Sequence, residues 1–196
     1  MKYLFDVFAS FIGLLFLFPL FLICSIAIVI DTGFPIFFKQ IRVGKNGVDF
    51  KLIKFRTMTI KKDAEKGSFD VGSSVRVTKV GKILRKTKLD ELPQLWNVLK
   101  GNMSLVGPRP EVRKWVEVYP ERWSFVHQVR PGITDPASIK FRNEEEILAK
   151  SVNPEKTYKE EILPLKLSFY EKYVRERTFL GDIKLIFQTL WTIVSK

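Results

Sequence analysis

The sequence predicts an α+β fold, in which a small, mostly helical domain carries one β-hairpin and follows a long apolar N-terminal segment. Three patterns lead to this prediction. One stretch near the N-terminus is uncharged throughout, a later stretch alternates around an Asn-Gly turn, and others repeat apolar side chains at helical spacing. A chain of 196 residues is long enough for one core of ordinary size. We therefore place a membrane segment at residues 1–31 and one globular domain at residues 32–196.

The apolar segment is long enough to cross a bilayer, because the twenty residues 11–30 would rise about 30 Å as a helix. A cleaved signal peptide is disfavoured, since the stretch is too long and no small-residue cleavage site follows it. Pro19 lies near its middle, and both a kinked spanning helix and a re-entrant helix that leaves on the side it entered tolerate a proline there. From the residues alone we favour a simple span, with its C-terminal flank in the cytoplasm because basic residues follow at Lys39, Arg42 and Lys45.

The β-hairpin is predicted from residues 35–43 and 48–57, which read as strands on either side of the turn Gly44-Lys45-Asn46-Gly47. In the second strand Phe50 and Leu52 alternate with charged neighbours, as expected when one face is buried. Residues 61–74 are polar and contain glycines and serines, so we predict a loop there.

The central part is predicted to be mainly helical. We expect helices at residues 81–86, at 92–99 with an end at Gly101, over 111–128, and over Glu144–Lys150, with a turn at Pro131-Gly132.

The tail is predicted to carry two amphipathic helices. The second has an apolar stripe formed by Ile183, Ile186, Phe187, Leu190, Trp191 and Val194. Packing against the core is the usual fate of such a stripe. A position in the membrane interface is nearly as well supported, because Trp191 and an apolar membrane segment occur in the same chain.

The charge balance indicates an anionic partner. The chain has 33 Lys and Arg residues against 21 Asp and Glu residues, and its formal net charge is +12. Lys2 and Asp6 cancel within residues 1–30, so the excess lies in the globular part, where phosphates, acidic lipid or nucleic acid could attract it. The single cysteine, Cys24, excludes an internal disulfide.

The pair Asp90-Glu91 is the sharpest candidate site. Pro93 favours a first helical turn, which places Asp90 at or near a helix N-cap, and an acidic pair there is also what ordinary capping would favour. Basic residues without an acidic neighbour precede the pair, at Arg76, Lys79, Lys82, Arg85, Lys86 and Lys88. A carboxylate among these cations should stay ionised, and it could act as a nucleophile or as a ligand for Mg²⁺ beside a diphosphate.

Arg109 lies between two prolines, and this stiff backbone would preorganise its guanidinium group for bidentate phosphate binding. Lys54, Arg56 and Arg142 are lesser candidates, since each of these side chains is more often a solvated charge. His127 is the only histidine, and neither a histidine-based metal cluster nor a glycine-rich phosphate loop can be built from the sequence.

Four segments together resemble the bacterial sugar transferases, also called monotopic phosphoglycosyl transferases. They are KFRTM at residues 54–58, LDELPQLWNVLKG at 89–101, MSLVGPRP at 103–110 and RPGIT at 130–134. They occur in the order found in that family, and the likeness extends from the apolar N-terminus to the tail.

The resemblance implies that the protein transfers a phosphosugar from a UDP-sugar to polyprenyl (undecaprenyl) phosphate through an aspartyl-phosphosugar intermediate, as the first membrane step of surface glycan assembly. Asp90 would be the nucleophile and would bind Mg²⁺, and Glu91 would assist it. Arg85, Arg109 and Arg142 would hold phosphates, and Lys54 and Arg56 would line the basic face of the substrate site.

The resemblance also implies a location and a set of partners. The N-terminal helix would be re-entrant and broken at Pro19, which reverses the preference drawn from the residues alone. The enzyme would lie on the cytoplasmic face of the bacterial inner membrane, in contact with membrane lipid and not with nucleic acid. The oligomeric state, a homodimer included, stays open.

The chain departs from the family pattern at two places. The helix break often reads Ser-Pro in the family, whereas this chain has Phe18-Pro19. After Ile133-Thr134 many members continue with Gly-Trp, whereas this chain has Asp135-Pro136-Ala137-Ser138. The donor sugar therefore cannot be transferred from a relative.

Two other classes of function compete with a transferase. A membrane-anchored module that binds anions without catalysis would explain the charge but not the Asp90-Glu91 pair together with Arg109. A membrane-bound phosphohydrolase would release free phosphosugar without a lipid acceptor.

Overall fold

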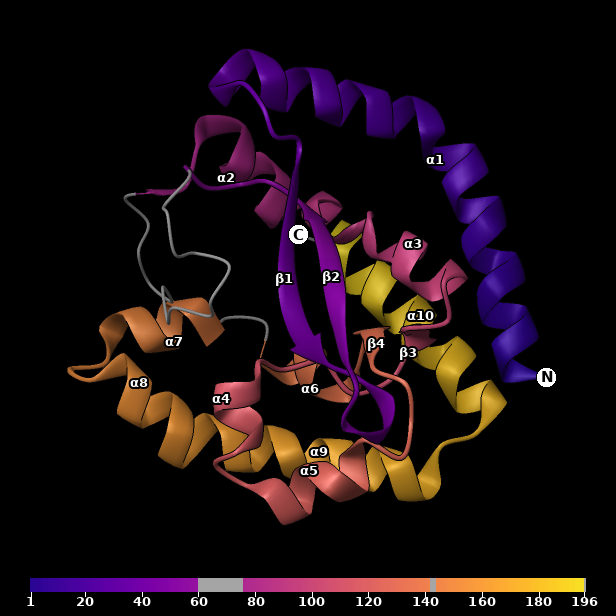
Figure 1. Ribbon diagram of the computed structural model, residues 1–196, viewed down its shortest axis with the longest axis vertical. Coiled ribbons are helices and arrows are strands. Elements are labelled where there is room, and N and C mark those ends of the chain that lie inside the picture. The colour runs from indigo at the N-terminus through magenta and orange to yellow at the C-terminus, as the bar shows by residue number, and fades with distance from the viewer. Residues whose placement is uncertain (60–75, 142–143, 196) are drawn as a thin grey trace.

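The computed structural model describes residues 1–59, 76–141 and 144–195. Within them the fold is mostly helical, with two small sheets and a long apolar N-terminal helix, as predicted (Figure 1). The loop predicted at residues 61–74 and the candidate Arg142 lie outside the described residues.

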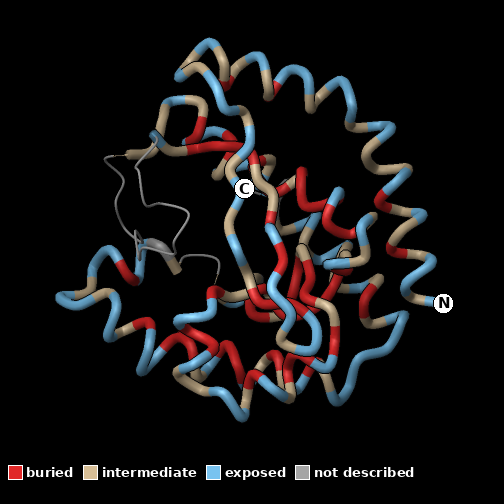
Figure 2. The backbone as a smooth tube through the Cα atoms, in the orientation of Figure 1, coloured by how far each residue is buried: buried red, intermediate tan, exposed pale blue. Residues whose placement is uncertain are grey.

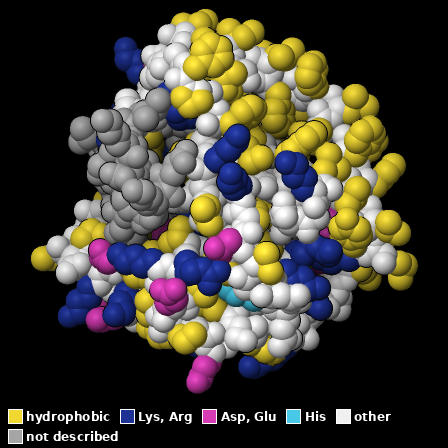
Figure 3. Space-filling view, viewed as in Figure 1, with side chains coloured by type: hydrophobic (Ala, Val, Ile, Leu, Met, Phe, Trp, Pro, Cys, Tyr) yellow, Lys and Arg dark blue, Asp and Glu magenta, His cyan; other side chains and the backbone are white. Residues whose placement is uncertain are grey.

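Helix α1 (Lys2–Thr32) forms a bent arch around one edge of the molecule (Figure 1). Pro19 lies inside it, and a proline is the usual cause of a sharp bend because it removes a backbone donor. The helix is long and apolar enough to cross a membrane, and only 11% of its most apolar stretch is buried. Hydrophobic side chains accordingly line the outer rim of the arch (Figure 3). These features are consistent with membrane association and distinguish α1 from a core helix.

The hairpin is confirmed. Strands β1 (Phe37–Val43) and β2 (Asp49–Phe55) pair antiparallel, from Phe37 opposite Phe55 to Val43 opposite Asp49. The connecting 3₁₀ turn η1 (Lys45–Gly47) places Asn46 at φ 57° and Gly47 at φ 74°. Asn and Gly tolerate this left-handed region best, which is why the Asn-Gly pair predicted the turn.

A second sheet was not predicted. Strands β3 (Ser104–Val106) and β4 (Gly132–Thr134) pair in parallel, so the turn predicted at residues 131–132 is wrong for Gly132. The two chains approach very closely here, since a Cβ added to Gly132 would lie 2.0 Å from the backbone nitrogen of Gly107. Strands of three residues are too short to show a period, and this pairing depends on a contact distant in sequence.

The central helices are short. They are α2 (Lys79–Lys86), the 3₁₀ turn η4 (Leu89–Glu91), α3 (Gln94–Leu99), α4 (Arg113–Val116), α5 (Pro120–Val126) and α6 (Pro136–Lys140). The helix predicted over residues 111–128 is divided in two, because Pro120 begins α5 and cannot continue α4. Helix α2 begins earlier than predicted, after Thr78, whose hydroxyl oxygen accepts a hydrogen bond from the N–H of Gly81.

The tail is mainly helical. It contains α7 (Glu144–Lys150), α8 (Pro154–Thr157), the π-helical turn η5 (Tyr158–Ile162), α9 (Leu163–Glu176) and α10 (Phe179–Val194). The bounds predicted for α7 are confirmed. The apolar stripe of α10 is only partly buried, since Ile183 and Ile186 are half-buried whereas Phe187 is 68% and Trp191 is 73% exposed. Its position in a membrane interface stays a prediction.

The buried side chains form separate clusters (Figure 2). The largest unites α5, α9 and the end of β1, with Trp123, Tyr170 and Val43 in its centre. A second joins α1 to α2 and β2 through Ile28, Leu84 and Phe55. A third joins β2 to α3 and the turn after it, through Phe50, Leu52, Val98 and Met103.

Both ends of α1 are tied to the rest of the chain by polar contacts. Near its start the Lys2 ammonium group donates to the Asp182 carboxylate in α10, at 2.5 Å. Near its end, the carboxylate of Asp31 accepts a hydrogen bond from the N–H of Val80 at 3.1 Å. The arch is therefore attached to the globular part at both termini.

Candidate active site

Asp90 and Glu91 lie in the 3₁₀ turn η4, which packs against α2 and β2. Lys88 precedes the turn in a left-handed conformation, with φ 58°. The predicted helix start is corrected here: α3 begins after Pro93, and the side chain of Asp90 caps no helix. Both acidic residues are buried, with 8% of Asp90 and 9% of Glu91 exposed.

Glu91 is held by two cations from different parts of the chain. The ammonium group of Lys54 in β2 donates to Glu91 Oε1 at 2.8 Å. The guanidinium group of Arg109 donates to both carboxylate oxygens, at 3.2 Å from Nη1 to Oε2 and more closely from Nη2 to Oε1. Burial by itself raises the pKa of Glu91, but Arg109 and Lys54 more than offset it and hold that pKa well below its usual value.

Asp90 has the opposite environment. Among the described residues none donates a hydrogen bond to its carboxylate, although the neighbouring Glu91 accepts three. Burial raises the pKa of Asp90 despite the attraction of Lys54, and Glu91 adds to the rise. This rise in the pKa of Asp90 is opposite in direction to the shift that the neighbouring cations alone would produce. Asp90 is therefore a poorly solvated carboxylate with free lone pairs, which suits a nucleophile.

The two cations that hold Glu91 retain capacity for a substrate. Arg109 has five N–H donors, of which two serve Glu91, and its side chain is 31% exposed. The charge of Glu91 raises the pKa of Arg109, so this group stays cationic. Burial lowers the pKa of Lys54.

Arg85 and Arg56, both predicted to belong to the substrate site, have different surroundings. Arg85 in α2 is half-buried and donates from Nε to the hydroxyl oxygen of Thr57 at 3.1 Å, so it lies beside the end of β2 near η4. Arg56 is 6% exposed and donates to the carbonyl oxygens of Thr32 at 3.1 Å and Gly33 at 2.5 Å. It satisfies orphan carbonyl groups at the end of α1. The predicted place of Arg56 on a basic face is thereby corrected to an anchor for α1.

The described residues contain no group of three or more His, Cys, Asp or Glu side chains that could hold a metal ion. Mg²⁺ is often bound by only one or two carboxylates together with substrate phosphates and water. The free carboxylate of Asp90 fits that role, whereas Glu91 is already engaged by Lys54 and Arg109.

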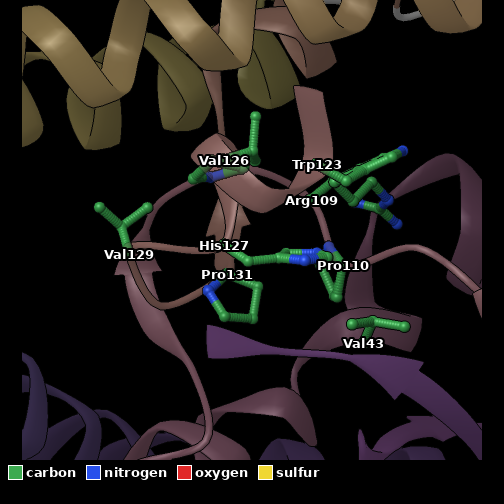
Figure 4. A pocket seen from close by; sticks show the side chains of 9 residues that line it. Val43, Arg109, Pro110, Trp123, Val126, His127, Val129 and Pro131 are labelled. Atoms are coloured by element: carbon green, nitrogen blue, oxygen red, sulfur yellow. The ribbon is translucent and has the colours of Figure 1, made fainter. Parts of the chain in front are cut away.

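A small cavity lies behind the Arg109 loop (Figure 4). Its volume is about 10 Å³, and its walls include Arg109, Pro110, Trp123 and His127. A cavity of this size has room for about one water molecule, so a nucleotide sugar does not fit here. Burial, and to a lesser extent Arg113, lowers the pKa of His127 to about 4, so its imidazole is neutral and adds no charge for a phosphate.

Two polar features of the site were missed by the sequence analysis. Glu111 directly follows the Arg109 loop and accepts hydrogen bonds from Arg42 at 2.8 Å and from the hydroxyl group of Tyr158 at 2.7 Å. Asn97 in α3 joins that helix to β2. Their partners lie far away along the chain, so no local pattern could have identified them.

Comparison with known proteins identifies the family of the chain. The family model described as bacterial sugar transferase matches residues 1–196. An uncharacterized sugar transferase of Bacillus subtilis, EpsL, is 47% identical over 144 residues, which are 73% of this chain and 70% of EpsL.

Two relatives with a named activity match nearly the whole chain. The UDP-glucose:undecaprenyl-phosphate glucose-1-phosphate transferase of Klebsiella pneumoniae is 37% identical over 97% of this chain and 39% of its own length. The UDP-N-acetylgalactosamine-undecaprenyl-phosphate N-acetylgalactosaminephosphotransferase of Aeromonas hydrophila is 34% identical over 97% of this chain and 43% of its own. The chain spans less than half the length of these two. With the family model matching from end to end, the chain belongs to the bacterial sugar transferase family.

Proposed function

We propose that the protein transfers a sugar 1-phosphate from a UDP-sugar to undecaprenyl or a similar polyprenyl phosphate. The observation that carries this proposal is the contrast within one buried pair: Glu91 is held by Lys54 and Arg109, and Asp90 beside it accepts no hydrogen bond from the described residues. A buried carboxylate left without partners needs an explanation, and an incoming phosphorus atom provides one.

The first step would form a bond between an Asp90 carboxylate oxygen and the phosphorus atom that bears the sugar. The bond from that phosphorus to the bridging oxygen breaks, and UMP leaves with the electron pair. Transferred phosphoryl groups need positive charge on their non-bridging oxygens, and the free donors of Arg109, with Lys54 and Arg85 nearby, would supply it.

In the second step an oxygen of polyprenyl phosphate would attack the same phosphorus atom. The bond to Asp90 breaks, the carboxylate is regenerated, and polyprenyl diphosphate-sugar is the product. Before the first step, Asp90 and the donor diphosphate would hold Mg²⁺, which would supply positive charge to the phosphate oxygens. Glu91 would act by holding Arg109 and Lys54 in place.

The membrane helix supports the choice of a lipid acceptor. The exposed apolar face of α1 and the exposed stripe of α10 would both contact lipid. The bend of α1, with Pro19 in its interior, supports a re-entrant helix that keeps both ends on the cytoplasmic face of the inner membrane.

The transferase proposal is tested by UMP release from UDP-sugars in the presence of Mg²⁺ and polyprenyl phosphate. Donor alone should give a phosphosugar adduct on Asp90, detectable by mass spectrometry of the digested protein. Asp90→Asn should lack both, and the exposed Asp49→Asn is the matched control that should retain both. Phosphosugar release without lipid would indicate a phosphohydrolase instead.

The re-entrant proposal has its own test. In a Cys24→Ser background, a cysteine inserted after Met1 and a second one at Lys39→Cys should both react only with a reagent that reaches the cytoplasm. Labelling of one of them from outside would mean that α1 spans the membrane.

A further inference from the structure

Asn97 is an almost fully buried side chain whose amide group has two partners in the neighbouring strand. It lies in α3 and is 1% exposed. Its Oδ1 accepts a hydrogen bond from the N–H of Ile53 at 3.0 Å, and its Nδ2 donates to the carbonyl oxygen of Lys51 at 2.8 Å. Both partners belong to β2, whose other edge is paired with β1.

The side-chain amide of Asn97 therefore makes the pair of hydrogen bonds that a third strand would make with this edge of β2. We call this pair of bonds the rung. An edge strand presents unpaired N–H and C=O groups, and a carboxamide is the side-chain group that can satisfy one of each at once. A leucine of similar size could fill the same space but would leave both backbone groups of β2 without a partner. Packing alone does not require an asparagine here.

The position of this rung links it to the proposed active site. Lys54 follows Ile53 directly, and its ammonium group lies 2.8 Å from Glu91 Oε1. Glu91 stands only a few residues before Asn97 in the chain, just ahead of α3. The rung thus joins the strand that carries the cation to the helix that follows the carboxylate.

The backbone of Asn97 contacts the segment that leads to the other cation, Arg109. Its carbonyl oxygen accepts hydrogen bonds from the N–H groups of Asn102 at 3.0 Å and Met103 at 3.2 Å. This closes the turn into β3, and β3 leads directly to the loop that carries Arg109. One residue therefore contacts the supports of both cations that hold Glu91.

We propose that Asn97 is a positioning residue, which sets the distance between Lys54 and Glu91 by locking β2 to α3. The inference rests on the proposed transferase function, because it states how the charged groups beside Asp90 are kept in register. Asn97 itself touches no reacting atom.

The first test is Asn97→Asp, which keeps the size of the side chain but, as a carboxylate, cannot donate to the carbonyl oxygen of Lys51. We expect kcat for UMP release to fall about 10- to 100-fold, since displacements near 1 Å in a catalytic site have effects of this size. The KM for the donor should change by less than about threefold. Asn102→Asp is the matched control, because Asn102 is exposed and its side chain bonds no described residue, and its kcat should stay within about twofold. An unchanged kcat in Asn97→Asp would overturn the proposal.

A double-mutant cycle distinguishes positioning from general destabilisation. If Asn97 acts through Lys54, Asn97→Asp should lower kcat by no more than about twofold when Lys54→Gln is already present. If the fold loss of kcat in the double variant equalled the product of the two single losses, Asn97 would act by a route that does not involve Lys54. All rates are compared at a temperature well below each variant's unfolding midpoint.

Hydrogen exchange tests the contact without any assay of activity. In the wild-type protein the amide of Ile53 should be protected, and in Asn97→Ala it should exchange much faster while the amides of α9 keep their protection. Rapid exchange of Ile53 in the wild type would overturn the inference even if both variants failed to fold. If the wild type is protected but releases no UMP from any donor, the proposed function fails and the structural role of Asn97 stands.

Discussion

Two glutamates close to the Arg109 loop, the buried Glu91 and the half-buried Glu111, show how similar ion pairs serve different purposes. Glu111 accepts hydrogen bonds from Arg42, from Tyr158 and from the N–H of Val112, and it joins β1 to the helical tail. Glu91 accepts comparable bonds from Lys54 and Arg109. The difference is the neighbour, since Glu91 is adjacent to the unpartnered carboxylate of Asp90 and Glu111 is followed by the buried apolar Val112.

The comparison shows what a charged cluster needs in order to be reactive. Around Glu111 the acidic group is satisfied, and the free energy of these contacts goes into holding two parts of the fold together. Around Glu91 the same kind of contact places Lys54 and Arg109 beside Asp90, whose carboxylate accepts no hydrogen bond from either of them. We interpret the first cluster as structural and the second as reactive, and each of the following experiments tests that division.

The largest expected effect is on chemistry. Asp90→Asn should lower the rate of UMP release by about 10³-fold or more, because the amide cannot attack phosphorus. Glu111→Gln should lower it by less than about tenfold when both are assayed as folded protein. The measurement is initial-rate release of UMP at saturating donor. Equal losses in the two variants would remove the distinction between the clusters.

The next effect is on stability and should appear in the other cluster. Glu111→Gln leaves the half-buried guanidinium group of Arg42 without its charged partner, which should lower the free energy of unfolding by about 2 kcal/mol. Denaturant unfolding followed by tryptophan fluorescence measures it, with the exposed Glu155→Gln as control. A change as small as that of the control would mean that the Arg42–Glu111 pair is not structural.

Acidification should separate the two clusters. The pKa of Asp90 is raised by burial, so its reactive ionised form is lost as the pH falls through a value above the usual 3.8. Burial also raises the pKa of Glu111, but Arg42 and Lys166 outweigh this and leave it below 4.5. Its contribution to stability is therefore fully present above 4.5 and is lost only as the pH falls through the lowered pKa.

Activity should thus decline at a higher pH than the folded structure does. Rates of UMP release and near-UV circular dichroism, recorded over the same pH series, measure the two transitions. Coincident transitions would contradict the raised pKa of Asp90.

The smallest expected effect is an increase in the free energy of unfolding, whereas most substitutions lower it. Asp90→Asn removes a buried carboxylate that has no hydrogen-bond donor among the described residues, so it should raise the free energy of unfolding by about 1 kcal/mol at neutral pH. The raised pKa has the same meaning: the folded protein binds that proton more tightly, and ionisation above the pKa costs stability. A destabilised variant would show that Asp90 has a structural partner after all.

The sequence by itself determined the features that depend on near neighbours. The uncharged run specified α1, the Asn-Gly pair specified the hairpin, and helical spacing located α10, because each signal repeats within one element. The basic segment before Asp90 and the prolines around Arg109 also marked the site, and the resemblance to a family assigned their roles.

Only the tertiary structure decided which cation meets which carboxylate. Arg56 and Lys54 are two residues apart in the same strand region, yet one holds carbonyl groups at the end of α1 and the other holds Glu91. The pairing of β3 with β4 and the rung made by Asn97 likewise depend on contacts far apart in the chain. Charge and spacing are local properties, whereas the partner of a buried group is chosen by the packing of elements that the local pattern does not relate to one another.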